Sequence, residues 1–330
     1  MKKIIFAIML LFILFFTKDI KAYSLNSETD KVYLGGETVG IKLNTGVKVI
    51  KTYAIIDGIN LIKPWYEAGI KEDDIIVSFN DKKINVSDDL IKELKVTKDK
   101  KTEITLLRDN EYIKTNIKPC YSNDSYSLGV YVKDNILGIG TLTYIIPNTN
   151  IFGALGHQID GAKDVGGTLY EATVTGVKKG TIGEAGSKLA KIKTTNIGQI
   201  EKNTVTGLHG NYSGKISEDD LISVAKREEV KLGKAYIYTC IDKSSVEKFE
   251  IEIISLSKQN TKDIKGIKFR VTDERLLSKT NGIVQGMSGS PIVQNDKLIG
   301  AVTHVLVNNP HEGYGIYIEF MFLDMGVILE

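Results

Sequence analysis

Short stretches in which apolar and polar residues alternate recur along most of this chain, and this period of two predicts strands. Residues 235–241 and 248–256 show the alternation clearly, as expected for strands with one face in a core. Three further stretches have the composition of strands: 137–144, 151–159 and 171–177. The chain has 31 glycines and many Val, Ile, Thr and Tyr residues, which favour short strands and turns over long helices. We therefore predict a mainly β protein.

The N-terminal residues 1–22 have a different pattern, that of an export signal. Lys2 and Lys3 are followed by an uninterrupted apolar run, residues 4–16, which is short for a membrane-spanning helix and usual for a signal. Residues 20–22, Ile-Lys-Ala, offer a cleavage site, although the lysine is unfavourable there. A cleaved signal peptide and a retained signal anchor both remain open. In either case we expect the rest of the chain to be exported.

Residues 31–118 resemble a PDZ domain. The strongest signal is residues 65–80, where Ala-Gly-Ile, an acidic turn, a strand and Asn follow one another as in bacterial PDZ domains. A helix is predicted from Ser87, an N-cap residue followed by two acids and several apolar positions. Two strand-like runs around Asp109 predict a closing hairpin: 102–107 and 112–117.

The PDZ resemblance implies a groove in which a bound peptide adds as an extra strand. The predicted helix from Ser87 forms one wall of this groove, and backbone amides in a glycine loop hold the terminal carboxylate of the peptide. The residues assigned to the loop and strand are Val39, Gly40, Ile41, Lys42 and Leu43. A degenerate groove that only packs on the rest of the protein remains the alternative, because a fold does not determine a function.

A polar, turn-rich stretch, residues 119–127, predicts a linker after the PDZ-like part. From residue 128 to residue 330 the pattern is again strand-like and predicts a second domain. A chain of 330 residues with 42% apolar residues is large enough for two cores. Its 43 basic and 41 acidic residues are intermixed, with a net charge of +2, and give no electrostatic case for nucleic-acid binding.

The two cysteines, Cys120 and Cys240, lie far apart in the sequence and match no zinc-binding spacing. A disulfide between them and two free thiols both remain open. The histidines likewise form no His-x-x-x-His pair. We therefore expect neither a metal nor another cofactor.

A glycine-rich segment, residues 282–293, carries the candidate chemistry. Apolar runs before and after its Gly-Met-Ser-Gly turn predict a strand–turn–strand with Ser288 at the tip. The amides of Gly286 and Ser288 can point at one oxygen, as an oxyanion hole requires. Ser290 is a competing nucleophile. An α/β-hydrolase elbow, Gly-x-Ser-x-Gly around Ser288, is disfavoured because position 290 is serine where that motif needs glycine. Taken alone, Gly-x-Ser-Gly is a common sequence.

Three segments together resemble the stage IV sporulation protein B peptidases of spore-forming bacteria. They read Gly-Ala-Leu-Gly-His at 153–157, Gln-Gly-Met-Ser-Gly-Ser-Pro-Ile at 285–292 and Gly-Ala-Val-Thr-His-Val at 300–305. The resemblance covers nearly the whole chain, from the N-terminal apolar segment to Met321. It implies a chymotrypsin-like double β-barrel after the PDZ domain, with a serine nucleophile and a histidine upstream of it.

Of the four histidines, His157 is the predicted general base, because it lies before the serine in a glycine-rich segment typical of the family. His304 is expected at a core or rim position, and His209 and His311 are expected to be solvated. The resemblance implies that the third catalytic residue is Asp273.

The spacing of Asp273 differs from that of chymotrypsin-like enzymes, where the aspartate lies in the first barrel. Asp273 instead lies close before the serine. Support of the loop under the oxyanion turn therefore remains an alternative role for it. Asp160 and Asp164, just after the histidine, remain alternative orienting residues.

These resemblances imply an exported serine endopeptidase that acts in sporulation. Peptidases of this family are secreted from the forespore into the space between its two membranes and cleave themselves. They cut the extracytoplasmic part of a membrane-bound regulator of an intramembrane metalloprotease, which permits late sigma-factor activation. The expected partners are a protein substrate, the chain itself and a membrane at the N-terminus, with no nucleic acid. The alternative is a non-catalytic PDZ-bearing adaptor with a peptidase-like fold.

Overall fold

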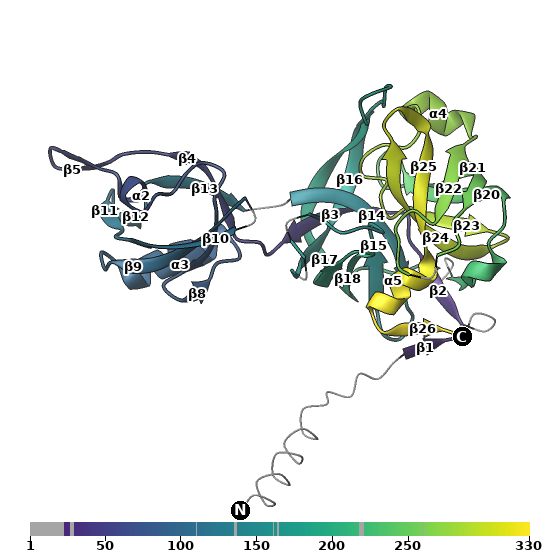
Figure 1. Ribbon diagram of the computed structural model, residues 1–330, viewed down its shortest axis with the longest axis horizontal. Coiled ribbons are helices and arrows are strands. Elements are labelled where there is room, and N and C mark those ends of the chain that lie inside the picture. The colour runs from purple at the N-terminus through teal and green to yellow at the C-terminus, as the bar shows by residue number, and fades with distance from the viewer. Residues whose placement is uncertain are drawn as a thin grey trace, which may run out of the picture.

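The computed structural model describes residues 23–26, 30–109, 111–134, 137–160, 162–163, 165–217, 221–259 and 261–330. The predicted export signal, residues 1–22, lies outside the described residues. Within the described part of the chain, no helix is long and apolar enough to cross a membrane. Strands make up most of the regular structure, as predicted, and Figure 1 shows them gathered in two units.

The first barrel is a closed sheet with the strand order β15-β18-β17-β16-β3-β14, in which β14 also pairs with β15. Alternate residues of β3 face the interior, since Val39, Ile41 and Leu43 are almost fully buried. Its strands are β3 (Thr38–Leu43), β14 (Leu137–Ile145), β15 (Ile151–Ala154), β16 (Gly167–Lys178), β17 (Ser187–Thr204) and β18 (Gly207–Tyr212). Closure leaves every strand of this barrel with two neighbours.

A second closed barrel lies in the C-terminal half, with the order β24-β23-β20-β21-β22-β25 and a further pairing of β24 with β25. Ile237, Phe249 and Phe269 are among the buried residues of its core. The predicted strands 235–241 and 248–256 are confirmed as β20 and β21. The elements are β20 (Gly233–Cys240), β21 (Val246–Leu256), β22 (Ile267–Val271), α4 (Glu274–Thr280), β23 (Pro291–Gln294), β24 (Lys297–Leu306), β25 (Asn309–Tyr317) and α5 (Ile318–Asp324).

Two short strands connect the barrels. β2 (Lys31–Leu34) pairs with β14 of the first barrel and with β19 (Leu221–Val224), which pairs in parallel with β24 of the second. β1 (Tyr23–Leu25) runs parallel to β26 (Val327–Leu329), and the short 3₁₀ helix η2 spans Arg227–Glu229. The double β-barrel implied by the family resemblance is thus present.

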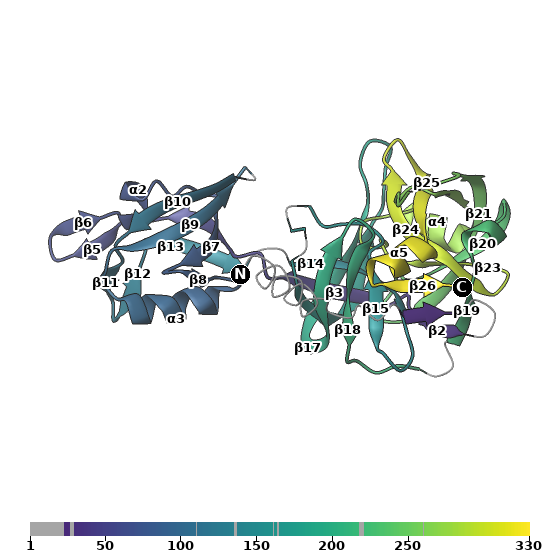
Figure 2. The same cartoon turned by 60° about the horizontal axis from the view of Figure 1, so that its bottom comes forward.

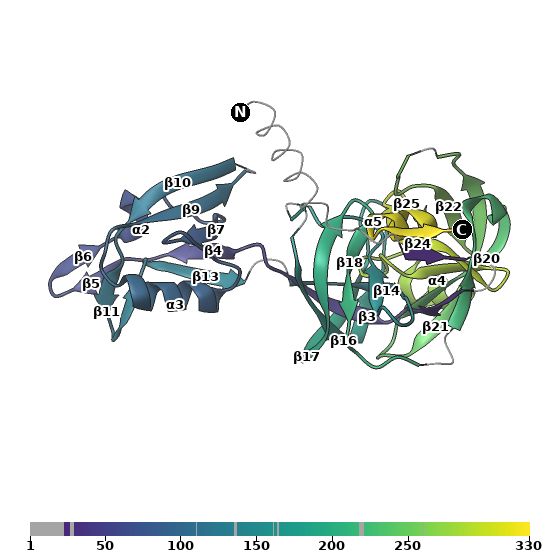
Figure 3. The ribbon, with the colours of Figure 1, turned by 90° about the horizontal axis from the view of Figure 1, so that it is seen from below.

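Between β3 and β14 the chain leaves the first barrel and forms a separate domain (Figures 1 and 2). Its main sheet has the order β10-β9-β7-β4-β13, and helix α3 (Ser87–Thr97) contacts β13, as Figure 3 shows. Leu90 and Leu94 of α3 pack with Phe79 in its core. The other elements are β4 (Val47–Thr52), β5 (Ile55–Asp57), β6 (Asn60–Ile62), α2 (Pro64–Glu67), β7 (Ile75–Phe79), β8 (Lys82–Lys83), β9 (Thr102–Arg108), β10 (Glu111–Ile117), β11 (Cys120–Ser122), β12 (Ser125–Ser127) and β13 (Val130–Asp134).

The local predictions in this inserted domain are largely confirmed. The predicted helix is α3, although its N-cap residue is Val86 rather than Ser87, and Asp89 accepts a hydrogen bond from the Val86 amide. The predicted closing hairpin is β9–β10. Of the two states left open for the cysteines, the structure has both Cys120 and Cys240 as free thiols.

The strand pairing corrects the predicted domain boundaries. Residues 31–43, whose pattern assigns them to the PDZ-like domain, form β2 and β3 and hydrogen-bond with barrel strands. Residues 119–127, the predicted linker, contain the hairpin β11–β12, and β13 completes the sheet of the inserted domain. The reason is that alternation identifies the buried face of a strand but not the sheet that the strand joins.

Candidate active site

Ser288 lies in a tight turn that belongs to the second barrel and rests against the first. Gly286 and Gly289 have φ angles of +91° and +92°, a backbone conformation that residues with a side chain rarely adopt. After the turn comes β23, as predicted. The run before the turn is not a strand, because only Gln285 forms an isolated bridge, with the first residue of β17. The predicted strand–turn–strand is therefore correct on its second side alone.

Strand β14 of the first barrel holds this turn through three carbonyl groups. The hydroxyl of Thr141 donates to the carbonyl oxygen of Gly286 at 2.8 Å, and its amide donates to that of Ser288 at 2.9 Å. The hydroxyl of Thr143 donates to the carbonyl oxygen of Gly289 at 2.8 Å. Both threonines are fully buried. The position of Ser288 therefore depends on both barrels.

His157 follows β15 in a sharp turn in which Leu155 and Gly156 have φ angles of +67° and +70°. This turn packs directly on the serine turn, since a Cβ atom at Gly289 would lie 2.4 Å from the amide nitrogen of Leu155. The predicted base and the predicted nucleophile, Ser288, thus come from neighbouring turns at the junction of the barrels.

The side chain of His157 has the tautomer that a general base needs. Its Nδ1 lies 2.9 Å from the carbonyl oxygen of Gln158, and because a carbonyl only accepts, Nδ1 carries the proton and donates it. Nε2 then keeps its lone pair. The partly exposed Ser288 hydroxyl donates to the carbonyl oxygen of Thr303 at 3.1 Å, so it has to leave this carbonyl before its proton can pass to His157.

A second histidine, His304, lies beside His157, with the ring centroids 5.2 Å apart. Burial lowers the pKa of His304 to about 4, and the charges of His157 and Lys265 act in the same direction. His304 is therefore neutral around pH 7. The two rings, Asp160 and Lys262 help to line a cleft of about 560 Å³. His304 thus occupies a rim position, as expected.

Asp273 is the N-cap residue of α4, and its carboxylate is engaged there. It accepts hydrogen bonds from the amides of Arg275 at 3.0 Å and Glu250 at 3.2 Å, and pairs with the Arg275 guanidinium at 2.8 Å. That guanidinium lowers the pKa of the Asp273 carboxyl. Among the residues that the structure describes, no hydrogen bond or ion pair joins Asp273 to His157. The implied role of Asp273 in orienting the histidine therefore has no contact in this arrangement to support it.

Two other groups lie closer to the predicted base. The backbone carbonyl of Gln158 holds Nδ1 of His157, and Asp160 is an exposed residue of the same cleft. Asp164, the other alternative, lies outside the described residues. The contacts therefore favour Gln158 as the group that orients the histidine in this arrangement.

We expect Asp273→Asn to keep peptidase activity within about tenfold of the wild type, because asparagine caps a helix about as well as aspartate does. Asp273→Ala should instead lower the free energy of unfolding by about 1 kcal/mol through the lost cap. Turnover and thermal unfolding of both variants provide the measurement. A fall of about 10⁴-fold in turnover of a folded Asp273→Asn protein would restore the triad role.

The amides of Gly286 and Ser288 are available as the predicted oxyanion hole. In the part of the chain that the structure describes, neither amide donates a hydrogen bond, whereas those of Met287 and Gly289 both donate to backbone carbonyls. Two free amides on either side of one residue match what a developing oxyanion needs. This geometry supports the assignment, which stays a prediction.

Of the remaining candidates, His209 lies in a different environment from the one expected. Ser290, the competing nucleophile, is fully buried, so a substrate carbonyl cannot reach it. His209, expected to be solvated, is also fully buried, accepts or donates a hydrogen bond with Thr206 at 3.1 Å, and has its pKa lowered to about 4 by burial. His311 is exposed, as expected, and bonds to Asn281.

The predicted peptide groove requires a correction. Its five residues form β3, and both edges of that strand are already paired, one with β14 and the other with β16. A peptide therefore cannot add to Val39, Gly40, Ile41, Lys42 or Leu43 as an extra strand. In the inserted domain, β13 is the end strand of the main sheet and lies beside α3. Gly129, with a φ angle of +73°, directly precedes this strand.

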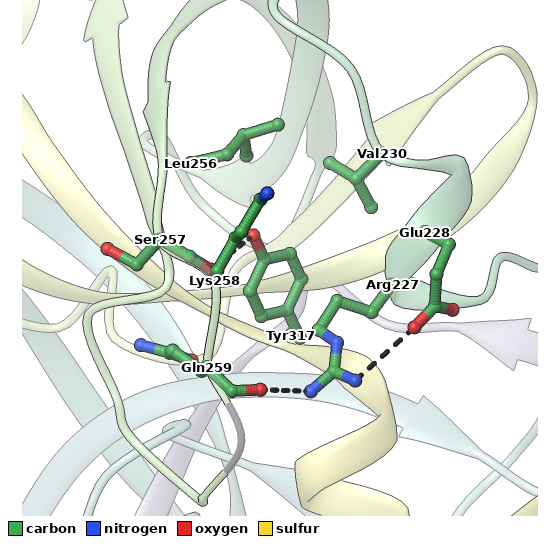
Figure 4. A pocket seen from close by; sticks show the side chains of 8 residues that line it. All are labelled: Arg227, Glu228, Val230, Leu256, Ser257, Lys258, Gln259 and Tyr317. Carbon is green, nitrogen blue, oxygen red and sulfur yellow. Dashed lines mark hydrogen bonds and ion pairs between the residues drawn. The ribbon is translucent and has the colours of Figure 1, made fainter.

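Another cavity, of about 500 Å³, lies in the second barrel (Figure 4). The Arg227 guanidinium there pairs with Glu228 at 3.3 Å and donates to the carbonyl oxygen of Gln259, and Tyr317 forms part of the lining. None of the predicted catalytic residues lines this cavity. His157 lines the cleft described above, and the Ser288 turn packs on the His157 turn, so that cleft is the candidate active site.

Comparisons with known proteins identify a peptidase domain and a PDZ domain in the chain. The family model described as SpoIVB peptidase S55 matches residues 124–322, and a PDZ domain model matches residues 31–118. The second range begins with β2 and β3, which pair with barrel strands in the structure. No curated protein matches the chain.

Two crystal structures of Rv3671c from M. tuberculosis share a low similarity with the chain. The inactive form of a serine-to-alanine mutant is 14% identical with a TM-score of 0.32, and the match covers 58% of this chain and 82% of that chain. The active form, described as a protease, is 15% identical with a TM-score of 0.31, and the match covers 58% and 75%. Neither similarity is close enough to support an argument about function.

Proposed function

Because the chain belongs to the SpoIVB peptidase S55 family, we propose that this serine peptidase is exported, cleaves itself and cuts the extracytoplasmic part of a membrane-bound regulator during sporulation. It would act between the two membranes of the forespore. Its cut would relieve the inhibition of an intramembrane metalloprotease and so permit late sigma-factor activation. The observation that carries the proposal is the packing of the Ser288 turn on the His157 turn.

The proposed reaction begins when the Ser288 hydroxyl leaves the carbonyl of Thr303. Nε2 of His157 takes the serine proton while Oγ attacks the scissile carbonyl carbon, and the amides of Gly286 and Ser288 stabilise the oxyanion. The imidazolium then gives its proton to the leaving amine, and a water molecule releases the acyl group by the same steps. The Gln158 carbonyl keeps the imidazole ring oriented throughout.

A fluorophosphonate probe tests the proposed nucleophile. The protein comprising residues 23–330 should react with the probe, and Ser288→Ala should not. Ser290→Ala is the matched control, because Ser290 lies in the same turn but is fully buried, and it should react as the wild type does. During storage the wild type should also be shortened by cleavage between about residues 22 and 60, while Ser288→Ala stays intact in mass spectra.

Two outcomes would count against this proposal. A folded wild type that does not react with the probe would favour the alternative, a non-catalytic PDZ-bearing adaptor. Equal fragmentation of the wild type and of Ser288→Ala would point to a contaminating protease and remove the support for self-cleavage.

We place the proposed peptide groove of the PDZ domain between β13 and α3. The amide of Ser87, at the start of α3, donates to Asp134 of β13 at 2.7 Å. Ile91 lies one helical turn later on the same side of α3 and is 49% exposed. A peptide that pairs with β13 would therefore contact Ile91 with an apolar side chain.

Substitution in this groove separates recognition from chemistry. Ile91→Glu should weaken binding to an array of peptides with free C-termini and leave the fluorophosphonate reaction unchanged. Val96→Glu is the control, because Val96 is exposed on another side of the same helix. If Ile91→Glu binds the array as the wild type does, the groove does not lie here.

A further inference from the structure

A buried lysine, Lys188, lies directly behind the turn that carries the nucleophile. Lys188 is 3% exposed, and its Nζ donates to the hydroxyl groups of Thr239 at 2.8 Å, Thr38 at 3.1 Å and Thr141 at 3.3 Å. An ammonium has three N–H donors and no acceptor, so three hydroxyl oxygens satisfy it. Thr239 belongs to the second barrel and the other two threonines to the first, so Lys188 joins the barrels at this point.

The charge of Lys188 has no counter-ion in the described part of the chain. Burial lowers the pKa of Lys188 to about 7, and the neighbouring Cys240 thiol acts weakly in the opposite direction. Taking an ammonium out of water without an anionic partner costs free energy that an apolar side chain of similar volume would not. Stability alone therefore does not explain a lysine at this position.

The backbone of Lys188 orients one side of Gly286. The Lys188 amide donates to the carbonyl oxygen of Gln285 at 2.9 Å. That carbonyl belongs to the same planar trans peptide group as the Gly286 N–H, and the two point in opposite directions. With the carbonyl directed at β17, the Gly286 N–H is directed away from β17, which leaves it available to a substrate oxygen.

The side chain of Lys188 orients the other side of Gly286 through Thr141. The Thr141 hydroxyl gives its single proton to the carbonyl oxygen of Gly286 at 2.8 Å, so it accepts the hydrogen bond from Nζ of Lys188. The lysine stem also packs behind this residue, since a Cβ atom at Gly286 would lie 3.2 Å from Cβ of Lys188. Without the ammonium, the hydroxyl is free to turn away from the carbonyl.

We propose that Lys188 is a positioning residue for the peptidase reaction, which holds the two peptide groups that flank Gly286 so that the Gly286 amide faces the oxyanion. The inference rests on the proposed use of Ser288 as nucleophile and of Gly286 in the oxyanion hole. Lys188 itself does not touch the substrate. Its effect is therefore expected on the rate of the chemical step and not on substrate binding.

The test compares the fluorophosphonate reaction of four full-length variants, with the maximal rate and the half-saturating probe concentration measured separately. Lys188→Met keeps the apolar stem and removes the donors, and Thr141→Val removes the connecting hydroxyl. Each should lower the maximal rate by about 10²–10³-fold, as the loss of one oxyanion donor does, with little change in half-saturation. The double variant should be no slower than the slower single variant, because both act through one path.

Thr239→Val is the matched control. It removes a hydroxyl partner of Lys188 that has no bond to the serine turn, so its maximal rate should stay within about threefold of the wild type. Thermal unfolding of each variant shows whether the fold is intact. If Lys188→Met does not fold, the maximal rate of Thr141→Val decides whether the inference holds.

Three results would overturn the inference: an unchanged maximal rate in folded Lys188→Met, additive losses in the double variant, or an equal loss in Thr239→Val. These results differ from a failure of the proposed function, in which the wild type itself would not react with the probe.

Discussion

Replacing Ser288 or His157 by alanine is expected to lower peptidase turnover by about 10⁶-fold, and replacing both should cost hardly more. The reason is that the serine hydroxyl is a poor nucleophile until a base removes its proton, and the base has no task without the serine. The two turns pack directly on each other, which gives the side chains the common location that this reaction needs. Turnover of a peptide substrate by the two single variants and the double variant provides the measurement.

His304 provides the control for the identity of the base. It lies beside His157 in the same cleft, but its pKa of about 4 makes it a weak base. His304→Gln should therefore keep turnover within about tenfold of the wild type. If His304→Gln were as damaging as Ser288→Ala while His157→Ala remained active, the base would be His304.

Gly289→Ala should destabilise the protein by about 3–5 kcal/mol, because two penalties add. The φ angle of Gly289 is +92°, which strains any residue with a side chain. In addition, the new Cβ atom would lie 2.1 Å from the carbonyl oxygen of Thr141 and 2.4 Å from the amide nitrogen of Leu155. Both are backbone atoms that cannot rotate away, so the contact between the barrels has to open. Denaturant unfolding measures the loss.

Gly183→Ala separates the two penalties. Gly183 has a similar φ angle, +89°, but no atom lies within 4 Å of the position of its Cβ atom. It should lose only the conformational part, about 1 kcal/mol. If both variants lost the same free energy of unfolding, crowding at the barrel junction would not be the cause. If Gly289→Ala were as stable as the wild type, the serine turn would not pack as described.

The division of the chain into domains shows where sequence patterns fail. Val39, Ile41 and Leu43 alternate with polar or small residues, which correctly predicts a strand whose apolar side chains lie in a core. Nothing in that pattern distinguishes an edge strand of a PDZ sheet from a strand inside a barrel. The choice depends on the pairing of β3 with β14 and β16, which begin about 100 and about 130 residues further along the chain.

Asp273 shows the same limit for a single side chain. Aspartate is a favoured N-cap residue, and in the structure Asp273 caps α4. Its proposed contact with a histidine in the other barrel requires two distant segments to meet, and only the fold decides whether they do. The carbonyl of Gln158, which holds His157 here, has no sequence signal because every residue has such a carbonyl.

The sequence by itself determined the mainly β class and the peptidase family, and it singled out His157 and Ser288 as the predicted catalytic residues. The class follows from alternation along the chain, whereas the two residues stand out because each lies among a few consecutive residues whose glycines favour a turn. Only the tertiary structure decided that a domain is inserted within the first barrel, that Ser290 is buried, and that Lys188 lies behind the serine turn. Burial and pairing are properties of segments that meet in space. The free energy that stabilises burial and strand pairing comes from contacts between residues far apart in the chain, and no local pattern contains those contacts.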